Sequence, residues 1–430
     1  MPSDTIPLDR PDPEIQPWGE KLGPGLITGA ADDDPSGIAT YSQAGSQFGY
    51  NILWTALVTY PLMVAIQMIS ARIGRVSGHG LATNIRRHYP MWLLYGTVIL
   101  LLTANTINIA ADLSAMGAAV NLVIGGPARL YILVLAVFSI LLQVFIPYTR
   151  YVKLLKWMTL ALFAYVGIIF AVKVPWGTVA LRTVMPHISW SNEYVTTVVA
   201  VLGTTISPYL FFWQASQEVE ELLAKKAQHA LKRDPVQGPS NLKRIRVDTL
   251  IGMGFSNVIA FFIVLTAAAT LHAHGITNIQ TSSQAASALK PIAGEFAFML
   301  FSIGIIGTGL LALPVLAGSA AYALAGTFKW RNSLESKPQL AKPFYAVIVL
   351  ACLVGIAITF TPIDPIKALF WSAVINGVVS VPIMVLLMFM VMNRKIMGEF
   401  VAPIFLRILG WLATGVMGIA ALGMFWFMLV

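Results

Sequence analysis

The sequence predicts an all-α polytopic membrane protein built from two inverted five-helix repeats and one extra helix. Of its 430 residues, 57% are hydrophobic and 11% are charged, a composition typical of membrane proteins rather than soluble domains. Apolar stretches long enough to cross a bilayer occur eleven times. Two of these stretches are interrupted by proline and polar residues, and they open the two halves of the chain. Broken helices in corresponding places of two halves are typical of transporters.

The expected spans follow from the apolar runs. The runs cover residues 23–48, 50–73, 91–121, 129–147, 152–174, 194–222, 247–271, 293–327, 343–361, 365–392 and 404–429. Five spans form each repeat, and an odd number of spans in one repeat inverts the next. The expected divisions are a tail, a first repeat, an extracellular loop, a second repeat and a last span, at 1–22, 23–174, 175–193, 194–392 and 393–430.

Lys and Arg are unevenly shared between the two ends of the spans. With a cytoplasmic N-terminus, the cytoplasmic side holds twenty of them and the outer side five. Basic residues favour cytoplasmic loops, so we expect this orientation, an extracellular C-terminus and a bacterial plasma membrane. The polar stretch 224–248 is expected to be a cytoplasmic loop. The bias explains the net charge of +9 without nucleic acid; the expected partners are a small substrate and the lipid bilayer, and a monomer is expected.

The first interruption holds three adjacent carboxylates. Asp32, Asp33 and Asp34 stand within an otherwise apolar run. Pro35 and Gly37 follow and break the helix there. An Asp at the bilayer centre costs about 2.5–3.5 kcal/mol on the insertion scale, and broken backbone at that depth is tolerated only inside protein or beside water. The pattern favours a cation site; the alternative interpretation is a helix cap at the membrane surface.

The second interruption opens the second repeat. Small and hydroxyl-bearing residues run from Gly203 to Ser207, and Pro208 ends the run. Because Pro208 has no backbone N–H, a carbonyl near Thr204 is expected to be free. Two broken helices in matching places indicate a transport site at the midplane between the repeats, where the negative ends of half-helices favour a cation.

Three parts of the sequence resemble the Nramp family of divalent-metal transporters. In the first span the resemblance lies at 23–26, 34–40, 43–45 and 49–50, where the family signature is Asp-Pro-Gly-Asn. The second interruption resembles the family's sixth span, with its signature Met-Pro-His, and Asp112-Leu113 matches an Asp-Leu pair in the third. The resemblance covers nearly the whole chain. It implies a fold like that of the leucine transporter, a divalent metal ion as substrate and no cofactor.

The chain departs from the family signatures at the metal site. The glycine and asparagine after the proline are Ser36 and Gly37, the methionine is Ser207, and the histidine is Tyr209. These departures resemble the Nramp-related magnesium transporters, which implies passive transport of Mg²⁺ and also of Mn²⁺. A thioether prefers softer transition metals, whereas oxygen ligands suit Mg²⁺. Because Mg²⁺ keeps several waters, the smaller side chains favour a partly hydrated ion.

The expected metal site combines carboxylate, hydroxyl and carbonyl oxygens. Asp34 is the anionic ligand, Ser207 offers its hydroxyl oxygen directly or through water, and Thr204 offers its carbonyl. Gly37 leaves room for water, and Asp33 is placed in the coordination or hydration shell. Further residues expected around the site are Asp32, Tyr209, Gln214, Asp112 and Asn376.

Three alternative functions remain open. The first is a proton-coupled importer of Mn²⁺ or Fe²⁺; however, the positions that match the family's proton route hold Tyr209, Gln214, Asn105 and Ala115, and 344–361 contains no Lys or Arg, which favours uncoupled transport. The second is a Mg²⁺-dependent intramembrane lipid transferase, although the second interruption holds no carboxylate for a metal-bound diphosphate. The third is an amino-acid carrier, whose carboxylate substrate the Asp run would repel. The chain is therefore not expected to be an enzyme.

Other polar residues have structural interpretations. Asp112 is interpreted either as a relay carboxylate or, as the favoured interpretation, as a partner of Asn105 and Asn108 in hydrogen bonds between helices. The acidic stretch 218–221 is interpreted either as a mouth that attracts cations or as a solvated helix end. Gly377 is expected to mark a closely packed helix crossing.

Overall fold

The computed structural model describes residues 24–146, 159–167, 170–224, 229–331, 333–334 and 338–429. This part of the chain is helical and contains no β-strand, which confirms the all-α prediction. Nine of its segments are long and apolar enough to cross a membrane. They are α4 (Trp54–Ser77), α6 (Met91–Ile124), α7 (Ala128–Phe145), the pair α11 (Asn192–Thr205) and α12 (Pro208–Ala224), α13 (Gly238–Thr270), α16 (Ala297–Phe328), α17 (Lys342–Thr359), α18 (Pro365–Met392) and α20 (Ile404–Leu429).

The first expected span is a further pair of short helices. α2 (Pro24–Asp32) and α3 (Pro35–Phe48) meet at the Asp run. The expected span 152–174 lies largely outside the described residues, and its described parts are η2 (Thr159–Leu162) and α9 (Phe163–Gly167). Ten of the eleven expected crossings therefore have a helical counterpart, and the eleventh stays a prediction.

Short helices connect the spans. The longest, α10, carries the exposed Trp176 of the expected extracellular loop, which suits a membrane interface. The short helices are η1 (Gly49–Ile52), α5 (Leu81–His88), α10 (Trp176–Val184), η4 (Pro235–Gln237), η5 (His272–His274), α14 (Ser282–Ser287), α15 (Lys290–Ala293), η6 (Gly294–Phe296), η7 (Pro338–Leu340) and α19 (Arg394–Met397).

A proline begins the second half of each broken helix. Pro35 begins α3 after α2 ends, and the Asp34 side chain caps α3 by accepting a hydrogen bond from the Gly37 N–H at 2.7 Å. Pro208 begins α12 after α11 ends at Thr205. Proline fits the first turn of a helix, because no partner is needed for its missing N–H, but it cannot continue the helix before it. Both breaks predicted from the sequence are confirmed.

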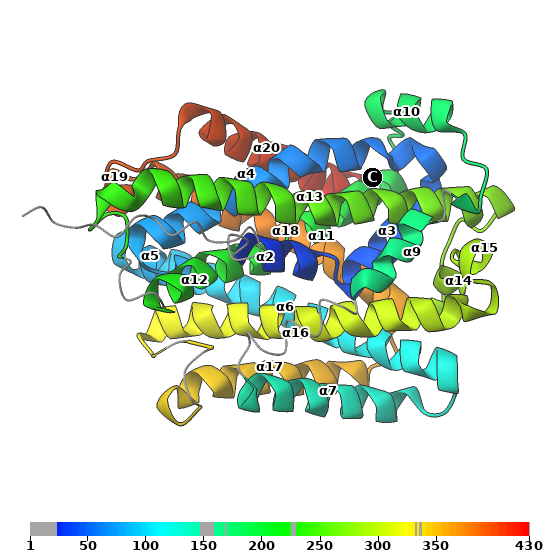
Figure 1. The fold of residues 1–430 in the computed structure, drawn as a ribbon, viewed down its shortest axis with the longest axis horizontal. Coiled ribbons are helices and arrows are strands. Elements are labelled where there is room, and N and C mark those ends of the chain that lie inside the picture. The colour runs from blue at the N-terminus through cyan, green and yellow to red at the C-terminus, as the bar shows by residue number, and fades with distance from the viewer. Residues whose placement is uncertain are drawn as a thin grey trace, which may run out of the picture.

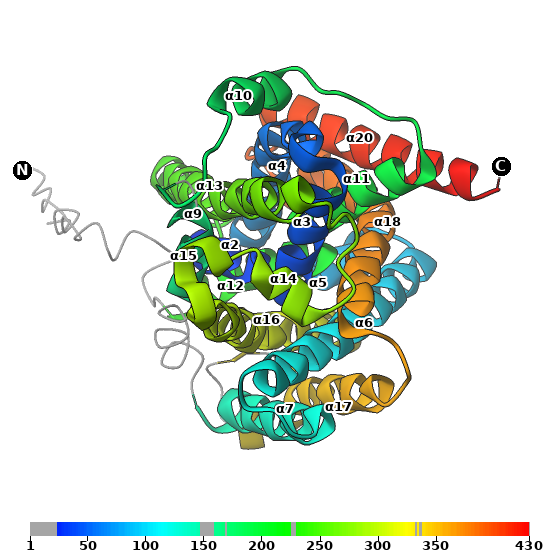
Figure 2. The same ribbon diagram turned by 90° about the vertical axis from the view of Figure 1, so that its right-hand side faces the viewer.

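The broken helices lie in the middle of the bundle (Figures 1 and 2). α2 and α3 pack along α13, α11 packs against α18, and α12 packs against α4 and α16. α7 and α17 lie at one edge, and α4 and α20 lie at the opposite edge (Figure 2). In its most apolar part the α11–α12 pair is 100% buried, against 28% for α20. The broken helices therefore lie in the interior of the bundle.

Glycines let the helices around the breaks approach closely. A Cβ added to Gly29 of α2 would lie 2.1 Å from the carbonyl oxygen of Gly252 in α13. A Cβ on Gly203 of α11 would lie 2.1 Å from the carbonyl oxygen of Ala373 in α18, and Gly377 lies in the same contact. These helices touch backbone to backbone, as small residues permit in membrane bundles. The closely packed crossing expected at Gly377 is confirmed.

The expected loop at 224–248 is wrong in its second half. α13 begins at Gly238, with Pro239 in its first turn, and continues through the polar residues. Arg244 Nη1 and Asp248 Oδ2, one helical turn apart, lie 3.9 Å from each other. Charged residues can extend a membrane helix where ion pairs and neighbouring helices satisfy them. The apolar run that begins at residue 247 therefore misses the first turns of α13, which begins at Gly238.

Candidate metal site

The Asp34 carboxylate lies at the first break and joins three helices. Its Oδ1 accepts the capping hydrogen bond from Gly37. Its Oδ2 accepts hydrogen bonds from the Tyr209 hydroxyl of α12 at 3.1 Å and from Asn108 Nδ2 of α6 at 3.2 Å. The residue is 2% exposed. The carboxylate that the sequence makes the anchor of the site therefore lies between both broken helices and α6.

Asp32 and Asp33 have a different partner. The hydroxyl of Ser256 on α13 lies 2.5 Å from Asp32 Oδ2 and 3.1 Å from Asp33 Oδ1, and its single proton can be donated to only one of them at a time. Both residues are buried. The structure thus divides the Asp run: Asp34 faces α3, α6 and α12, while Asp32 and Asp33 share a hydroxyl of α13.

The hydroxyl of Ser207 turns back toward the end of α11. Its Oγ lies 2.8 Å from the Gly203 carbonyl oxygen and 2.9 Å from that of Thr204, as donor to either. The expectation of a free Thr204 carbonyl is therefore wrong in part. Pro208 leaves this carbonyl without its helical partner, and Ser207 replaces that partner; the remaining lone pairs of both oxygens can still accept a ligand.

Gly37 and Thr204 bring the two breaks together. A Cβ added to Gly37 would lie 3.3 Å from Thr204 Oγ1 and 3.4 Å from the carbonyl oxygen of Asp32. α18 holds both breaks from one side, because Ser380 Oγ donates to the Ile206 carbonyl at 2.7 Å, and the hydroxyls of Ser372 and Ser36 lie 3.3 Å apart. The broken ends of α2, α3, α11 and α12 thus meet in one region of the bundle, next to Gly37 and Thr204.

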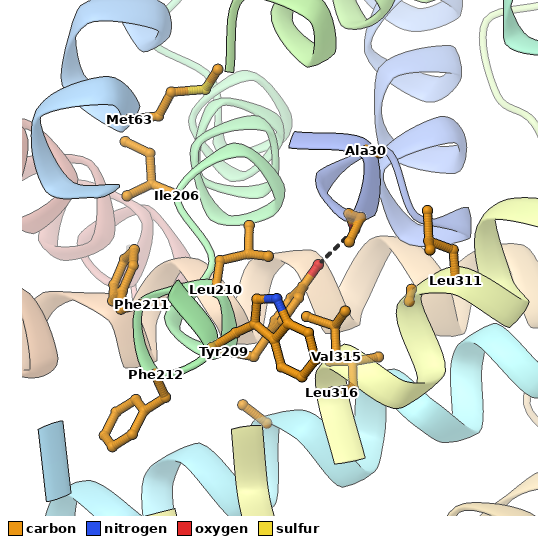
Figure 3. Close-up of a cluster of buried hydrophobic side chains, with 14 of the residues drawn as sticks. Ala30, Met63, Ile206, Tyr209, Leu210, Phe211, Phe212, Leu311, Val315 and Leu316 are labelled. Carbon is orange, nitrogen blue, oxygen red and sulfur yellow. Dashed lines mark hydrogen bonds between the residues drawn. The ribbon is translucent and has the colours of Figure 1, made fainter. Parts of the chain in front are cut away.

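Tyr209 and Gln214, expected near the site, tie α12 to α2. The Tyr209 hydroxyl also lies 3.4 Å from the Ala31 carbonyl oxygen. Figure 3 shows this hydroxyl pointing toward the end of α2 near Ala30, out of a cluster of buried apolar side chains. Gln214 Oε1 accepts a hydrogen bond from the Thr28 hydroxyl. Both side chains therefore hold one half-helix against the other.

Several buried oxygens around the Asp run accept no hydrogen bond from any described residue. Buried carboxylates and amide oxygens need a donor or a cation, and this set fits an oxygen-bound cation. The described residues contain no cluster of three or more His, Cys, Asp and Glu side chains able to hold an ion, so an ion at Asp34 would also use amide, hydroxyl and carbonyl oxygens or water. The unpaired oxygens are Asp32 Oδ1, Asp33 Oδ2, both oxygens of Asp112, Asn108 Oδ1 and Asn376 Oδ1.

The polar residues of α6 separate into two roles. Asn105 Nδ2 donates to the Leu316 carbonyl and to Ser319 Oγ of α16, both at 2.8 Å, which confirms its interpretation as a helix–helix contact. For Asp112 the same interpretation is wrong, since neither of its oxygens has a donor among the described residues. Asn108 binds Asp34 instead.

Sequence reasoning missed Ser256 and Asn108 as residues of the site. Ser256 is one serine within an apolar span, and nothing in its neighbourhood along the chain distinguishes it. Asn108 and Asp112 are four residues apart on α6 and share a face of that helix. That spacing was the available signal that Asn108 faces the same interior as Asp112.

A buried charge cluster joins helices at the end of the bundle where most Lys and Arg residues are expected, which we call the basic end. The cluster consists of Arg75, Glu218, Glu221, Arg244 and Asp248. Glu218 accepts a hydrogen bond from Arg244, and its Oε2 lies 3.8 Å from Arg75 Nη1. Glu221 Oε2 lies 3.6 Å from Arg75 Nη1 and 3.1 Å from Arg244 Nη2. The side chain of Glu218 is 0% exposed, so the interpretation as a solvated helix end is wrong for Glu218, whereas the side chain of Glu221 is 18% exposed.

The buried charge cluster also reaches α2. Asp248 Oδ2 accepts a hydrogen bond from the Gly25 N–H at 2.7 Å. Its members lie on α4, α12 and α13, and α2 and α12 are the half-helices that lead from the breaks to this end. The cluster therefore ties α2 to α4, α12 and α13 at this end of the bundle.

A cavity of about 410 Å³ opens on the other side of the breaks. It is lined by residues of α3, α11 and α18, among them Gln43, Thr196 and Ile366. These are the helices that lead from the two breaks away from the buried charge cluster. The cavity therefore lies at the end of the bundle opposite to that cluster.

Comparison with known proteins identifies the family. The model of the Nramp family, described as natural resistance-associated macrophage protein-like, matches residues 25–427. The divalent metal cation transporter MntH of Klebsiella pneumoniae is 26% identical over an alignment of 404 residues that covers 91% of this chain and 90% of that protein. MntH of Deinococcus radiodurans is 26% identical over an alignment of 440 residues that covers 95% of this chain and 94% of that protein.

Solved structures show the same fold. The Eremococcus coleocola manganese transporter, in complex with an aromatic bis-isothiourea substituted compound, matches with a TM-score of 0.71 at 18% identity, over 94% of this chain and 85% of that one. Mhp1, a nucleobase-cation-symport-1 family transporter, matches in a closed conformation with a TM-score of 0.55 at 13% identity, over 95% and 92%. The chain is a membrane protein with the leucine-transporter-like fold, and it belongs to the Nramp family.

Proposed function

We propose that the chain carries a divalent metal ion across the membrane by alternating access, with the ion bound at Asp34. The observation that carries this proposal is the place of Asp34, a buried carboxylate between the ends of two broken helices. The unpaired oxygens around it suit a cation, and the relatives named above are divalent metal and manganese transporters. The test is uptake of Mg²⁺, Mn²⁺ and Ca²⁺ into proteoliposomes, followed with a metal-sensitive dye.

The comparisons support Mn²⁺ as the transported ion. They favour the proton-coupled importer of Mn²⁺ or Fe²⁺, the first alternative drawn from the sequence, over a protein dedicated to Mg²⁺. A second candidate is Mg²⁺. It is supported by the possible metal ligands around Asp34, which are the side-chain oxygens of Asn108, Tyr209 and Ser207 and backbone carbonyl oxygens. Oxygen donors suit Mg²⁺ and Mn²⁺ alike, whereas soft ligands would exclude Mg²⁺. We therefore propose that both ions are carried.

Selectivity is expected to follow the softness of the ligands. The double variant Ser207→Met, Gly37→Asn places a thioether at the second break and an amide at Gly37, where an added Cβ would lie 3.3 Å from Thr204 Oγ1. A thioether prefers Mn²⁺, and the added volume displaces water from Mg²⁺. We expect the ratio of Mg²⁺ to Mn²⁺ uptake to fall about tenfold, equivalent to about 1.4 kcal/mol.

The control for this variant is Ser139→Met, which makes the same change on α7 at the edge of the bundle. It is expected to leave the ratio unchanged. A parental ratio in the double variant, at measurable uptake, would count against Ser207 as a neighbour of the ion.

Against the proton-coupled alternative, the residues of this chain predict that metal transport proceeds without protons. Tyr209 and Gln214 stand where the family resemblance places a proton route, and the structure shows both in hydrogen bonds that hold α12 to α2 and Asp34. Tyrosine titrates near 10 and amides do not titrate, so neither exchanges protons at neutral pH as histidine does. An inside-negative potential should then drive uptake directly, by about 2.3 kcal/mol per charge per 100 mV.

The measurement uses liposomes loaded with a pH dye under an inside-negative potential, to which Mn²⁺ or Mg²⁺ is added. The expected result is metal uptake with no acidification above that of protein-free vesicles. Acidification that depends on the metal and on the protein would instead establish the proton-coupled alternative.

A further inference from the structure

A groove on the lipid-facing side of the bundle lies between α4, α13 and α20. Its volume is about 630 Å³, within the range of ligand sites in proteins. Most of its wall is apolar, and the apolar residues include Tyr60, Val64 and Met68 of α4, Leu250 of α13, and Leu406 and Leu409 of α20. A groove of this kind between membrane spans suits an acyl chain.

Three basic residues also line this groove. They are Arg72, Lys243 and Arg246. Arg72 donates from Nε to the Phe400 carbonyl at 2.9 Å and from Nη2 to the Val401 carbonyl at 3.3 Å. No carboxylate lines the groove, and among the described residues none forms an ion pair with these three. The groove therefore carries positive charge that no described carboxylate neutralises.

α13 separates this groove from the buried charge cluster. With 3.6 residues per turn, Lys243, Arg246 and Leu250 share one face of the helix, and Arg244 and Asp248 lie on the opposite face. The first face lines the groove, and the second forms the ion pairs described above. The basic residues of the groove are thus distinct from those that pair with acids inside the bundle.

We propose that this groove binds an anionic phospholipid, with its phosphate at Lys243 and Arg246 and one acyl chain along the apolar wall. The charge is complementary to a lipid of net negative charge, and the apolar wall matches its chain. A zwitterionic lipid would bring a cationic headgroup to a basic end, and free phosphate would leave the apolar wall unused. The inference depends on the expected orientation, in which this end faces the cytoplasmic leaflet with its negative surface potential.

A second basic cavity offers a matched comparison. It has a volume of about 320 Å³ and is lined by His79, Arg87, Lys232, Arg233 and Lys395, among others. Burial lowers the pKa of His79, and the nearby Arg87 and Arg233 lower it further. This cavity lacks the long apolar wall of the groove, so it suits a free anion better than a lipid. Removal of two charges here is the control for their removal in the groove.

The experiment measures the thermal unfolding of the purified full chain in detergent during titration with dioleoylphosphatidylglycerol. Parallel titrations use dioleoylphosphatidylcholine, short-chain dihexanoylphosphatidylglycerol and inorganic phosphate. We expect the long-chain anionic lipid to raise the unfolding midpoint at the lowest concentration. In the variant Lys243→Gln, Arg246→Gln the lipid concentration for half of the shift should rise at least tenfold, since each basic residue near an anionic lipid contributes a factor of about five.

The control variant Lys232→Gln, Arg233→Gln should respond like the parent. Equal shifts with phosphatidylcholine, or with inorganic phosphate, would overturn the proposal, and so would loss of the response in the control variant alone. If the double variant does not fold, the single variants Lys243→Gln and Arg246→Gln make the same comparison. None of these outcomes depends on metal transport.

Discussion

The variant Asp34→Asn is expected to reduce metal uptake into proteoliposomes to the level of protein-free vesicles. Asparagine caps a helix as well as aspartate does, so the start of α3 is kept, and its amide oxygen can accept the hydrogen bond that Gly37 now donates to Asp34. The change therefore keeps the cap but removes the charge and one acceptor oxygen, because an amide NH2 cannot accept the hydrogen bonds that Tyr209 and Asn108 donate to Oδ2. A divalent cation near the bilayer midplane would then lose the carboxylate that lies between the two breaks.

The matched control is Asp364→Asn. Asp364 caps α18 by accepting hydrogen bonds from the N–H groups of Ile366 and Lys367, and it is not among the neighbours of Asp34. Its variant should transport at the parental rate. Asp34→Ala should also be inactive, but it loses the cap as well, at about 1 kcal/mol. Uptake by Asp34→Asn at near the parental rate would show that the ion binds elsewhere.

The breaks and most spans could be predicted because their causes are local. Apolar length sets a span and proline ends a helix, so the expected limits of α18 and α20 match the structure. The carboxylate of Asp34 lies at a break for the same reason, since Pro35 begins the next helix directly after it.

Contacts between distant segments could not be predicted. Ser256 meets Asp32 across 224 positions of the chain, and no local pattern indicates that. The start of α13 depends on ion pairs with α12, and the Thr204 carbonyl depends on which way the Ser207 hydroxyl turns. In each case the hydrogen-bond or ion-pair partner of a polar group is set by how the chain folds. The sequence shows only that the group is polar and needs a partner.

Glu218→Ala is expected to destabilise the folded protein by about 3–5 kcal/mol, because removal of one partner of a buried ion pair leaves its counter-charges buried. Glu218 is 0% exposed and contacts Arg75 and Arg244 from two other helices. Without it, the two guanidinium groups face each other with less negative charge between them. The exposed Glu295 gives the control, and Glu295→Ala should change the free energy of unfolding by less than about 0.5 kcal/mol.

The measurement is the free energy of unfolding in detergent for Glu218→Ala, Arg244→Ala and the double variant. Because the two side chains are hydrogen-bonded, the double variant should be more stable than the sum of the single effects predicts, by about 1–3 kcal/mol. The same variants carry a functional readout. Since the cluster joins the ends of α2, α4, α12 and α13, its loss should favour opening at that end. The readout is a cysteine placed at Gln217, next to Glu218. A membrane-impermeant thiol reagent should label this cysteine faster in the variant than in the parent. Additive stability changes would show that Glu218 and Arg244 are not coupled, and equal labelling rates would show that the cluster does not keep this end closed.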